Sequence, residues 1–425
     1  MLRATAAAGG GKEAKGQMPG DSAAPAPAPA DEKRKKKGAS ASAAGGGIPP
    51  NTPFDPQDAL LKLAELRHAH ARRPTRETAD AVKALCFEHD FAGLAIDTLE
   101  DNAELDAAEE EKLLATREKR LDELDAKVVE AKEKYGQIEV TDALLARASF
   151  RAKSGTREEA ARFEIAEDFD SSKSLSSGRH IDVLFERMRL AFAWDDFKSL
   201  KSHVAMANKL LETGGDWDRR NRLKVYQGVA AVMSRNWSRA ADDLLGCLAT
   251  FTSEELFSYE RFVLYCIVVA LVALDRVDLK AKVVDSAEVA SIISVAVGTT
   301  PAPSSIHTLT PEAAARCARD AGEAKVAGRL MSAFYECRYR DFFVALCDTF
   351  DVLAKDRFFA THAKWFVREM RVKGYAQYLA SYRSVKLASM ASTFGVSAPF
   401  LEAELAAFIA AKRLAAKIDA STGVV

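Results

Sequence analysis

A helix-forming pattern that repeats every 40 residues constrains the fold of this chain more than any other feature. Small or apolar residues that open a helix recur at this spacing at Ala160, Leu200 and Ala240. Three residues before each of them, at the turn between two helices, stand Arg157, Phe197 and Trp237. Helix pairs with such a period bury their apolar faces against the next pair, so the pattern predicts an α-solenoid. The period alone leaves open whether the pairs are tetratricopeptide-like or HEAT-like.

Helical signals extend from Phe54 onward. Thr156 and Glu159 form a capping box, in which each side chain accepts a hydrogen bond from a backbone N–H at the start of a helix. Residues 105–134 combine many charged side chains with a narrow apolar stripe, which predicts one long, exposed, ion-paired helix. A coiled coil is the weaker alternative, because the apolar pattern is not sustained over enough heptads.

The first 53 residues differ from the rest in composition. They hold nine of the 23 glycines, seven of the 13 prolines and no aromatic residue, so we expect them to be disordered. They contain no signal-peptide-like apolar region and no repeated arginines of a transit peptide. A basic run covers Lys33–Lys37, for which a nuclear import signal and a merely solubilising patch are equal alternatives.

Overall composition excludes several classes of protein. The 425 residues can form two or three domains with large cores, and the net charge of −1 does not favour nucleic acid or an acidic membrane. The longest apolar run, Phe262–Leu274, is too short to span a bilayer and predicts a buried core helix. The six cysteines form no C-x-x-C pair, and we expect free, mostly buried thiols in a reducing compartment.

Two segments late in the chain break the helical rhythm. Residues 291–311 carry turn-forming glycine, proline and serine and predict a surface loop, after which Pro311 starts a new helix. Near the C-terminus, a short helix ends at Gly395, a second begins at Ser397, and residues 417–425 predict a small β-hairpin. Helix, short strand, helix, helix and hairpin together indicate a winged helix.

No catalytic, cofactor-binding or metal-binding residues are assigned from the sequence. His68 and His70 have the opening spacing of a metalloprotease-type zinc site, but Thr78 and Ala81 stand where its Ser and Asp are required. Residues 59–72 also predict a helix, on which side chains two apart point in nearly opposite directions. The chain has no P-loop and no G-x-S-x-G motif. We therefore expect no enzyme activity and a function that resides in the surfaces of the protein.

The segment Gly214–Gly228 combines a tight turn with a basic, amphipathic helix, which by itself indicates only a solvated face above a packed one. Its sequence closely resembles a signature of the seventh non-ATPase subunit family of the proteasome regulatory particle lid. Further motifs follow in the order of that family: Ala249–Ser253, Leu274–Arg276, Tyr335–Tyr339, Val367–Arg371, Ser381–Ser384, Met390 with Phe394–Val396, and Phe408–Ala411. The resemblance extends from about Leu144 to Asp419.

The resemblance implies an all-α fold, with a right-handed, tetratricopeptide-like α-solenoid followed by a C-terminal winged helix with a small β-hairpin. The sequence departs from the family in residues 1–53, in a longer loop at 296–310, and in Lys412, where the family usually has glycine. The family also continues into a C-terminal helix, whereas this chain ends at Val425. The predicted parts are an extension (1–53), a helical-repeat domain (54–235) and a scaffold domain (236–425), the last divided into a helical bundle (236–376) and a winged helix (377–425).

The implied function is that of a non-catalytic scaffold in the proteasome lid, supporting ubiquitin-dependent protein degradation through contacts with other lid subunits and, indirectly, with the base of the regulatory particle. No cofactor, small-molecule substrate or membrane is expected, and the expected location is the cytoplasm and nucleus. The alternatives are a signalosome scaffold and a winged-helix nucleic-acid-binding module. Nucleic acid is disfavoured because the second winged helix begins with the acidic Glu402 and Glu404.

Two groups of residues are predicted to contact partners, one in the signature helix and one in the winged helix, where edge strands would pair across chains. They are Asp216, Trp217, Arg219, Arg220, Arg222, Lys224, Ser384, Val385, Leu387, Lys417, Ile418 and Val424.

Overall fold

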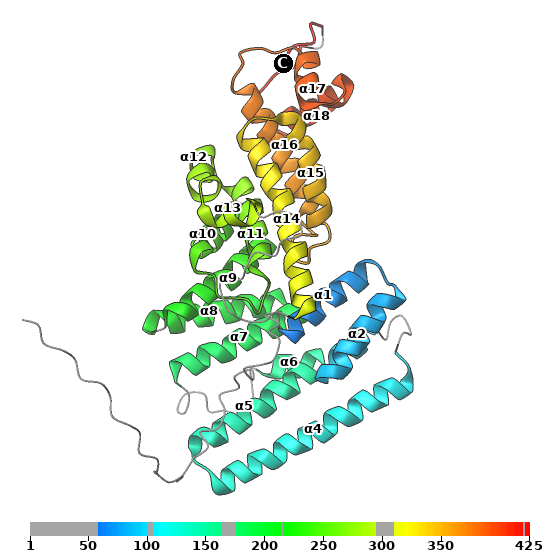
Figure 1. Ribbon diagram of the computed structural model, residues 1–425, viewed down its shortest axis with the longest axis vertical. Helices are drawn as coiled ribbons and strands as arrows, with labels where there is room; N and C mark the ends of the chain where they lie inside the picture. The colour runs from blue at the N-terminus through cyan, green and yellow to red at the C-terminus, as the bar shows by residue number, and fades with distance from the viewer. Residues whose placement is uncertain (1–57, 100–104, 164–175, 215, 295–309, 420) are drawn as a thin grey trace, which may run out of the picture. The chain divides into compact units, whose positions relative to one another are not determined.

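The computed structural model describes residues 58–99, 105–163, 176–214, 216–294, 310–419 and 421–425 (Figure 1). All of them belong to one compact unit, Thr52–Val425. The extension at 1–53 lies outside the described residues, as does the loop at 296–310 except for Thr310, and the predictions made for both stay predictions.

The described residues are nearly all helical, as the sequence predicts, and no β-strand is assigned among them. The first ten helices are α1 (Ala59–Arg72), α2 (Arg76–His89), α3 (Ala92–Leu99), α4 (Ala107–Lys134), α5 (Gln137–Ser154), α6 (Arg157–Arg162), α7 (Ser177–Ala193), α8 (Phe197–Thr213), α9 (Trp217–Met233) and α10 (Trp237–Leu245). They are followed by α11 (Tyr259–Ala273), α12 (Arg276–Leu279), α13 (Ala287–Ser294), α14 (Pro311–Tyr335), α15 (Tyr339–Leu353), α16 (Ala363–Leu379), α17 (Leu387–Phe394) and α18 (Ala398–Ala410). A 3₁₀ turn covers Leu248–Thr250, and a π-helical turn covers Lys280–Val284.

The 40-residue pattern marks the starts of three helices. Helices α6, α8 and α10 begin at Arg157, Phe197 and Trp237, which were predicted to lie in the turns, so the spacing of 40 is present and each helix starts three residues earlier than expected. Each follows a polar N-cap residue, Thr156, Asp196 and Asn236, whose side chain accepts a hydrogen bond from the first turn of its helix. The capping box of Thr156 and Glu159 is present as predicted.

The turns before α8 and α10 share one backbone geometry, which recurs before α15. In each turn a non-glycine residue adopts a left-handed conformation: Asp195 at φ 52°, Arg235 at φ 59° and Cys337 at φ 59°. The next residue donates its N–H to a carbonyl five positions earlier, as Asn236 does to Ala231. This is the Schellman arrangement, which satisfies the last carbonyls of one helix and starts the next within three residues.

Three clusters of buried apolar side chains hold the helices together. The largest extends from α7 to α16, and α11 lies inside it with every residue from Phe262 to Leu271 buried, as predicted for a core helix. A second cluster joins α1, α2 and α3 to parts of α4 to α7, and a third joins α15 and α16 to α17 and α18. Within the described residues, no single helix is long and apolar enough to cross a bilayer, and α17 and α18 pass that test only as a pair bent by 102°.

A buried ionic network ties α11 to α14 and to the connection between α15 and α16. Its centre is Arg261 of α11, whose guanidinium nitrogens lie 2.6 Å from Asp356, 2.8 Å from Asp320 and 2.9 Å from Glu323. The Tyr265 hydroxyl donates to Asp356 at 2.6 Å. Burial by itself would lower the pKa of Arg261, but the surrounding acidic groups, Asp320 and Asp356 among them, raise it further. The guanidinium therefore stays protonated.

The C-terminal end of α7 is capped by two arginines from distant parts of the chain. Arg67 of α1 donates to the carbonyl of Ala193 at 2.6 Å and lies over the Trp194 ring. Arg357, in the connection between α15 and α16, donates to the carbonyl of Phe192 and to Asp195. Cations suit a helix C-terminus because of the exposed carbonyls and the helix dipole.

The predicted β-hairpin at 417–425 does not form among the described residues. Only two isolated antiparallel bridges are present, and both involve Val424, which pairs with Lys386 and with Asp419. The Asp419 carboxylate accepts hydrogen bonds from the Ser421 and Thr422 hydroxyls, which lower its pKa to about 2. Each pairing of Val424 is a single bridge, one to Asp419 and one to Lys386, so no strand is assigned.

The loop predicted to begin at residue 291 begins later, because α13 continues to Ser294 and Ile292 is buried against the core. The restart of a helix at Pro311 is confirmed, with Thr310 as its N-cap.

Replacing Arg261 with Met should lower the free energy of unfolding by about 3–5 kcal/mol, because Asp356 would lose its counter-charge in a buried site, and Asp320 and Glu323 would keep only that of Arg319 nearby. Arg329→Met, on the exposed pair of Arg329 with Asp348, should change it by no more than about 0.5 kcal/mol. Urea denaturation of both variants measures the difference, and equal losses would show that the network is not central to stability.

Candidate interaction surfaces

The signature segment forms the start of α9, with Asp216 as its N-cap residue. Gly214 precedes it at φ 146°, a backbone conformation that favours glycine. Leu223 and every residue from Val225 to Val232 are buried, so the later part of α9 lies inside the core and the first two turns carry the basic side chains. The predicted turn and helix are therefore present, and the position of the basic side chains decides what the segment can bind.

Two of the three arginines hold α9 against its neighbours. Arg219 makes a bidentate pair with Asp182 of α7 at 2.9 and 2.8 Å, and these hydrogen bonds raise the pKa of Arg219. Arg220 donates to the carbonyl of Leu211 near the end of α8 at 3.0 Å. Both side chains therefore stabilise the packing of α7, α8 and α9.

The third arginine, Arg222, belongs to a partly buried polar cluster. Its Nε lies 2.6 Å from Glu255, and its guanidinium lies 4.8 Å from the centre of the Phe185 ring. The Tyr226 hydroxyl donates to the same Glu255 oxygen at 3.1 Å, and burial raises the pKa of Tyr226. Asp58 joins this cluster through its N–H, which donates to the carbonyl of Glu255 at 3.2 Å. Arg222 therefore links α9 to the segment between α10 and α11.

The other predicted contacts of this group lie on the surface. Trp217 exposes 61% of its area, and Asp216 and Lys224 are also exposed. An exposed tryptophan beside charged groups is typical of an interface residue. The three arginines therefore make contacts within the chain, although Arg220 is also exposed. Trp217 and Lys224 are exposed, and the exposed Asp216 lies 3.8 Å from Arg219.

The second predicted group lies where the C-terminal segment meets the start of α17. Val385 and Val425 exchange both backbone hydrogen bonds, at 3.0 and 2.9 Å, and the Leu387 N–H donates to the carbonyl of Gly423. Val424 lies between Lys386 and Asp419 in the two bridges. The structure therefore brings Val385, Leu387 and Val424 together.

Ser384, Lys417 and Ile418 flank this pairing. Ser384 and Lys417 are exposed, and Ile418 is half-buried against the third core cluster. Extended backbone beside isolated bridges of this kind offers an edge to which another extended segment can bind.

Of the two charged residues of α18, Glu402 and Glu404, one is engaged within the chain. Glu404 accepts from Arg371 at 2.7 Å and from the Tyr375 hydroxyl at 2.5 Å, so it points toward α16 and not outward. Arg413, just after α18, pairs with Glu369 of α16. Of the two acidic residues expected to repel nucleic acid, only Glu402 is exposed.

His68 and His70 both lie on α1, as predicted. Nδ1 of His70 is 2.9 Å from the hydroxyl of Thr78. No group of three or more His, Cys, Asp or Glu side chains within the described ranges is placed to hold a metal ion.

Sequence reasoning missed the acidic partners of the signature arginines. Asp182 lies 37 residues from Arg219, and Glu255 lies 33 residues from Arg222. No local spacing pattern connects these residues, because their contacts depend on how whole helices pack.

Comparisons with known proteins place these features in a family. Residues 106–282 match the model of the 26S proteasome subunit RPN7, and residues 348–425 match that of the PCI domain. A 26S proteasome non-ATPase regulatory subunit 6 homolog from Arabidopsis thaliana is 35% identical over 322 residues, which cover 76% of this chain and 75% of that protein.

Two further relatives agree. The 26S proteasome non-ATPase regulatory subunit 6 of Dictyostelium discoideum is 37% identical over 74% of each chain. The 26S proteasome regulatory subunit RPN7 of Saccharomyces cerevisiae is 37% identical over 80% of this chain and 72% of that protein.

The fold and these matches define a helical proteasome regulatory subunit with a PCI domain. The chain belongs to the family of the 26S proteasome subunit RPN7, also called non-ATPase regulatory subunit 6.

Replacing Arg222 with Ala should lower the free energy of unfolding by about 1–3 kcal/mol, because Glu255 would lose its charged partner in a partly buried site. Lys224 is exposed and lies two residues further along the same helix. Lys224→Ala should change the free energy of unfolding by less than about 0.5 kcal/mol. Chemical denaturation followed by circular dichroism measures both, and an unchanged stability of the Arg222 variant would assign this arginine to a role outside the fold.

Proposed function

We propose that this protein is a non-catalytic scaffold subunit of the lid of the proteasome regulatory particle. The observation that carries the proposal is the similarity to named proteasome regulatory subunits over about three quarters of both chains. In this role the protein supports ubiquitin-dependent degradation by holding neighbouring lid subunits in place, so that ubiquitylated substrates are positioned for deubiquitination and degradation.

We further propose that the helices before residue 236 form a right-handed, tetratricopeptide-like solenoid. The equal spacing of the starts of α6, α8 and α10 and their shared capping support this architecture. In the same proposal the helical-repeat domain covers 54–235, the helical bundle 236–376 and the winged helix 377–425. The order of α16, a short extended segment, α17 and α18 supports the winged helix.

The proposed contacts with other lid subunits lie at two places. The first is the exposed start of α9, around Trp217. The second is the backbone edge beside Val385, Lys417 and Ile418, where an extended segment of a neighbouring winged helix would add to the bridges already formed by Val424. The base of the regulatory particle would be contacted only indirectly.

The alternatives are less well supported. A signalosome scaffold shares the architecture, but the relatives named above are proteasome subunits. For nucleic acid, α18 would have to present basic groups at its start, and the exposed charge there is Glu402. Arg413 is paired with Glu369, which further weakens that reading. We therefore propose a protein without enzyme activity whose partners are proteins.

The incorporation of an affinity-tagged chain into the lid tests this function. The wild-type protein should co-purify with other lid subunits, and Trp217→Ala should reduce their recovery about tenfold, as expected when an aromatic anchor is lost. Val277→Ala removes an equally exposed apolar side chain on α12 and should leave recovery unchanged. Recovery of signalosome subunits in place of lid subunits would support the alternative.

We propose a location in both cytoplasm and nucleus, with the basic run Lys33–Lys37 as the import signal. Replacing these five residues with alanine should reduce the nuclear fraction of the isolated, fluorescently tagged subunit. Replacing the separate Lys12 and Lys15 serves as a control that should not alter it. If the alanine variant of Lys33–Lys37 shows an unchanged nuclear fraction, the basic run is a solubilising patch and not an import signal.

A further inference from the structure

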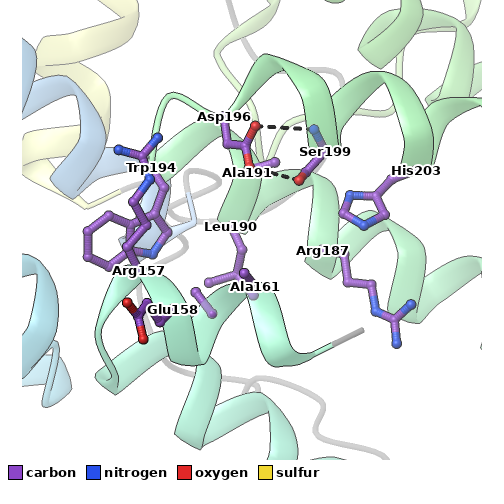
Figure 2. Close-up of a pocket in the computed structure, with 11 residues that line it drawn as sticks. Arg157, Glu158, Ala161, Arg187, Leu190, Ala191, Trp194, Asp196, Ser199 and His203 are labelled. Carbon is purple, nitrogen blue, oxygen red and sulfur yellow. Dashed lines mark hydrogen bonds between the residues drawn. The ribbon is translucent and has the colours of Figure 1, made fainter. Parts of the chain in front are cut away.

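Polar side chains around the cavity between α6, α7 and α8 are engaged within the chain (Figure 2). The cavity measures about 230 Å³, and its Asp196 accepts a hydrogen bond from the Ser199 hydroxyl at 2.7 Å. Arg187 donates to the carbonyl of Phe163 at 3.0 Å. The exposed face of α15 differs from this cavity, because it carries charged side chains that have no ion pair among the described residues.

Four exposed side chains form one stripe along α15, which packs beside α14 and α16 (Figure 1). They are Arg340, Val344, Cys347 and Asp351. Spacings of four, three and four residues keep side chains on one side of a helix. Val344 exposes 61% of its area, and a free cysteine behaves as a small apolar side chain. The stripe therefore has a cation at one end, an apolar centre and an anion at the other end.

The two end charges of the stripe are available to a partner. Within the described part of the chain, neither of them has an ion pair. The two other acidic residues of α15 are engaged, because Asp341 lies 2.6 Å from Arg338 and Asp348 lies 3.4 Å from Arg329. The charges of α15 that lack a described partner are therefore those at the two ends of the stripe.

The stripe is complementary to a second copy of itself that runs in the opposite direction. Arg340 lies four residues before Val344, and Asp351 lies four residues after Cys347, so the stripe is symmetric about its midpoint. A twofold axis at this midpoint places Arg340 of each copy opposite Asp351 of the other, and Val344 opposite Cys347. Twofold interfaces have this reciprocity, in which residue i contacts j and j contacts i. A parallel arrangement would instead place like charges opposite each other.

We propose that the free chain forms a weak homodimer in which the α15 stripes of two copies pack antiparallel about a twofold axis. This inference goes beyond the proposed function, because it concerns the chain without other lid subunits. A second copy fits because the stripe presents both signs of charge in the order that its own reversed copy matches. Exposed ion pairs around a small apolar centre provide specificity more than affinity, so the association is weak.

Charge reversals at the two ends of the stripe test the pairing. Sedimentation equilibrium of the purified full-length chain, at concentrations up to about 100 µM, should show a concentration-dependent dimer. Arg340→Glu and Asp351→Arg should each weaken self-association at least about tenfold, because each places like charges opposite each other at both ends of the interface. An equimolar mixture of the two variants should associate as the wild type does, since contacts between unlike variants again join opposite charges.

Lys119→Glu reverses an exposed charge on α4 and should leave the association unchanged, which controls for the net charge of the chain. A wild type that is monomeric at every concentration would overturn the inference. So would single variants that associate like the wild type, a mixture that associates no better than its components, or an equal loss with Lys119→Glu. Thermal unfolding of each variant, expected to match the wild type, shows that lost association is not lost folding. The lid proposal fails separately, because it is measured by the recovery of other subunits.

Discussion

The ion pairs of Arg261 are the constraint on which the arrangement of the large core depends. Helix α11 is apolar on every side, so apolar packing alone does not determine its rotation about its own axis. A buried cation whose partners come from α14 and from the connection before α16 supplies that restriction, because any other orientation leaves charges unpaired. We infer that the network selects one packing of the core, while the apolar side chains provide most of the stabilisation.

The contacts of the signature segment change how its sequence is understood. Arg219, Arg220 and Arg222 are distinctive in sequence, and such residues are easily taken for a binding surface. In the fold they join α9 to α7, to α8 and to the segment around Glu255. A family signature can therefore consist of residues that hold helices together within the chain. Candidate binding residues such as Trp217 are identified by the exposed fraction of their side chains in the structure.

Local chemistry explains which features could be predicted from the sequence. Helix starts at Arg157, Phe197 and Trp237 follow from capping residues next to them, and α11 follows from its apolar run. The hairpin prediction was wrong because the C-terminal residues pair on two sides, with Lys386 and with Asp419, and each pairing is a single bridge. The acidic partners of Arg219 and Arg222 could not be predicted, since these contacts depend on how whole helices pack.

The two arginines at the end of α7 have a consequence for how the protein is made. Arg67 contacts Ala193 across 126 positions of the chain, and Arg357 contacts Phe192 across 165. A ribosome synthesises the first arginine well before α7 and the second long after it, so this helix end waits for Arg357 to emerge. During that interval its carbonyls are capped from one side only. The contact between Arg357 and the end of α7 can therefore form only after the chain has been synthesised past α15.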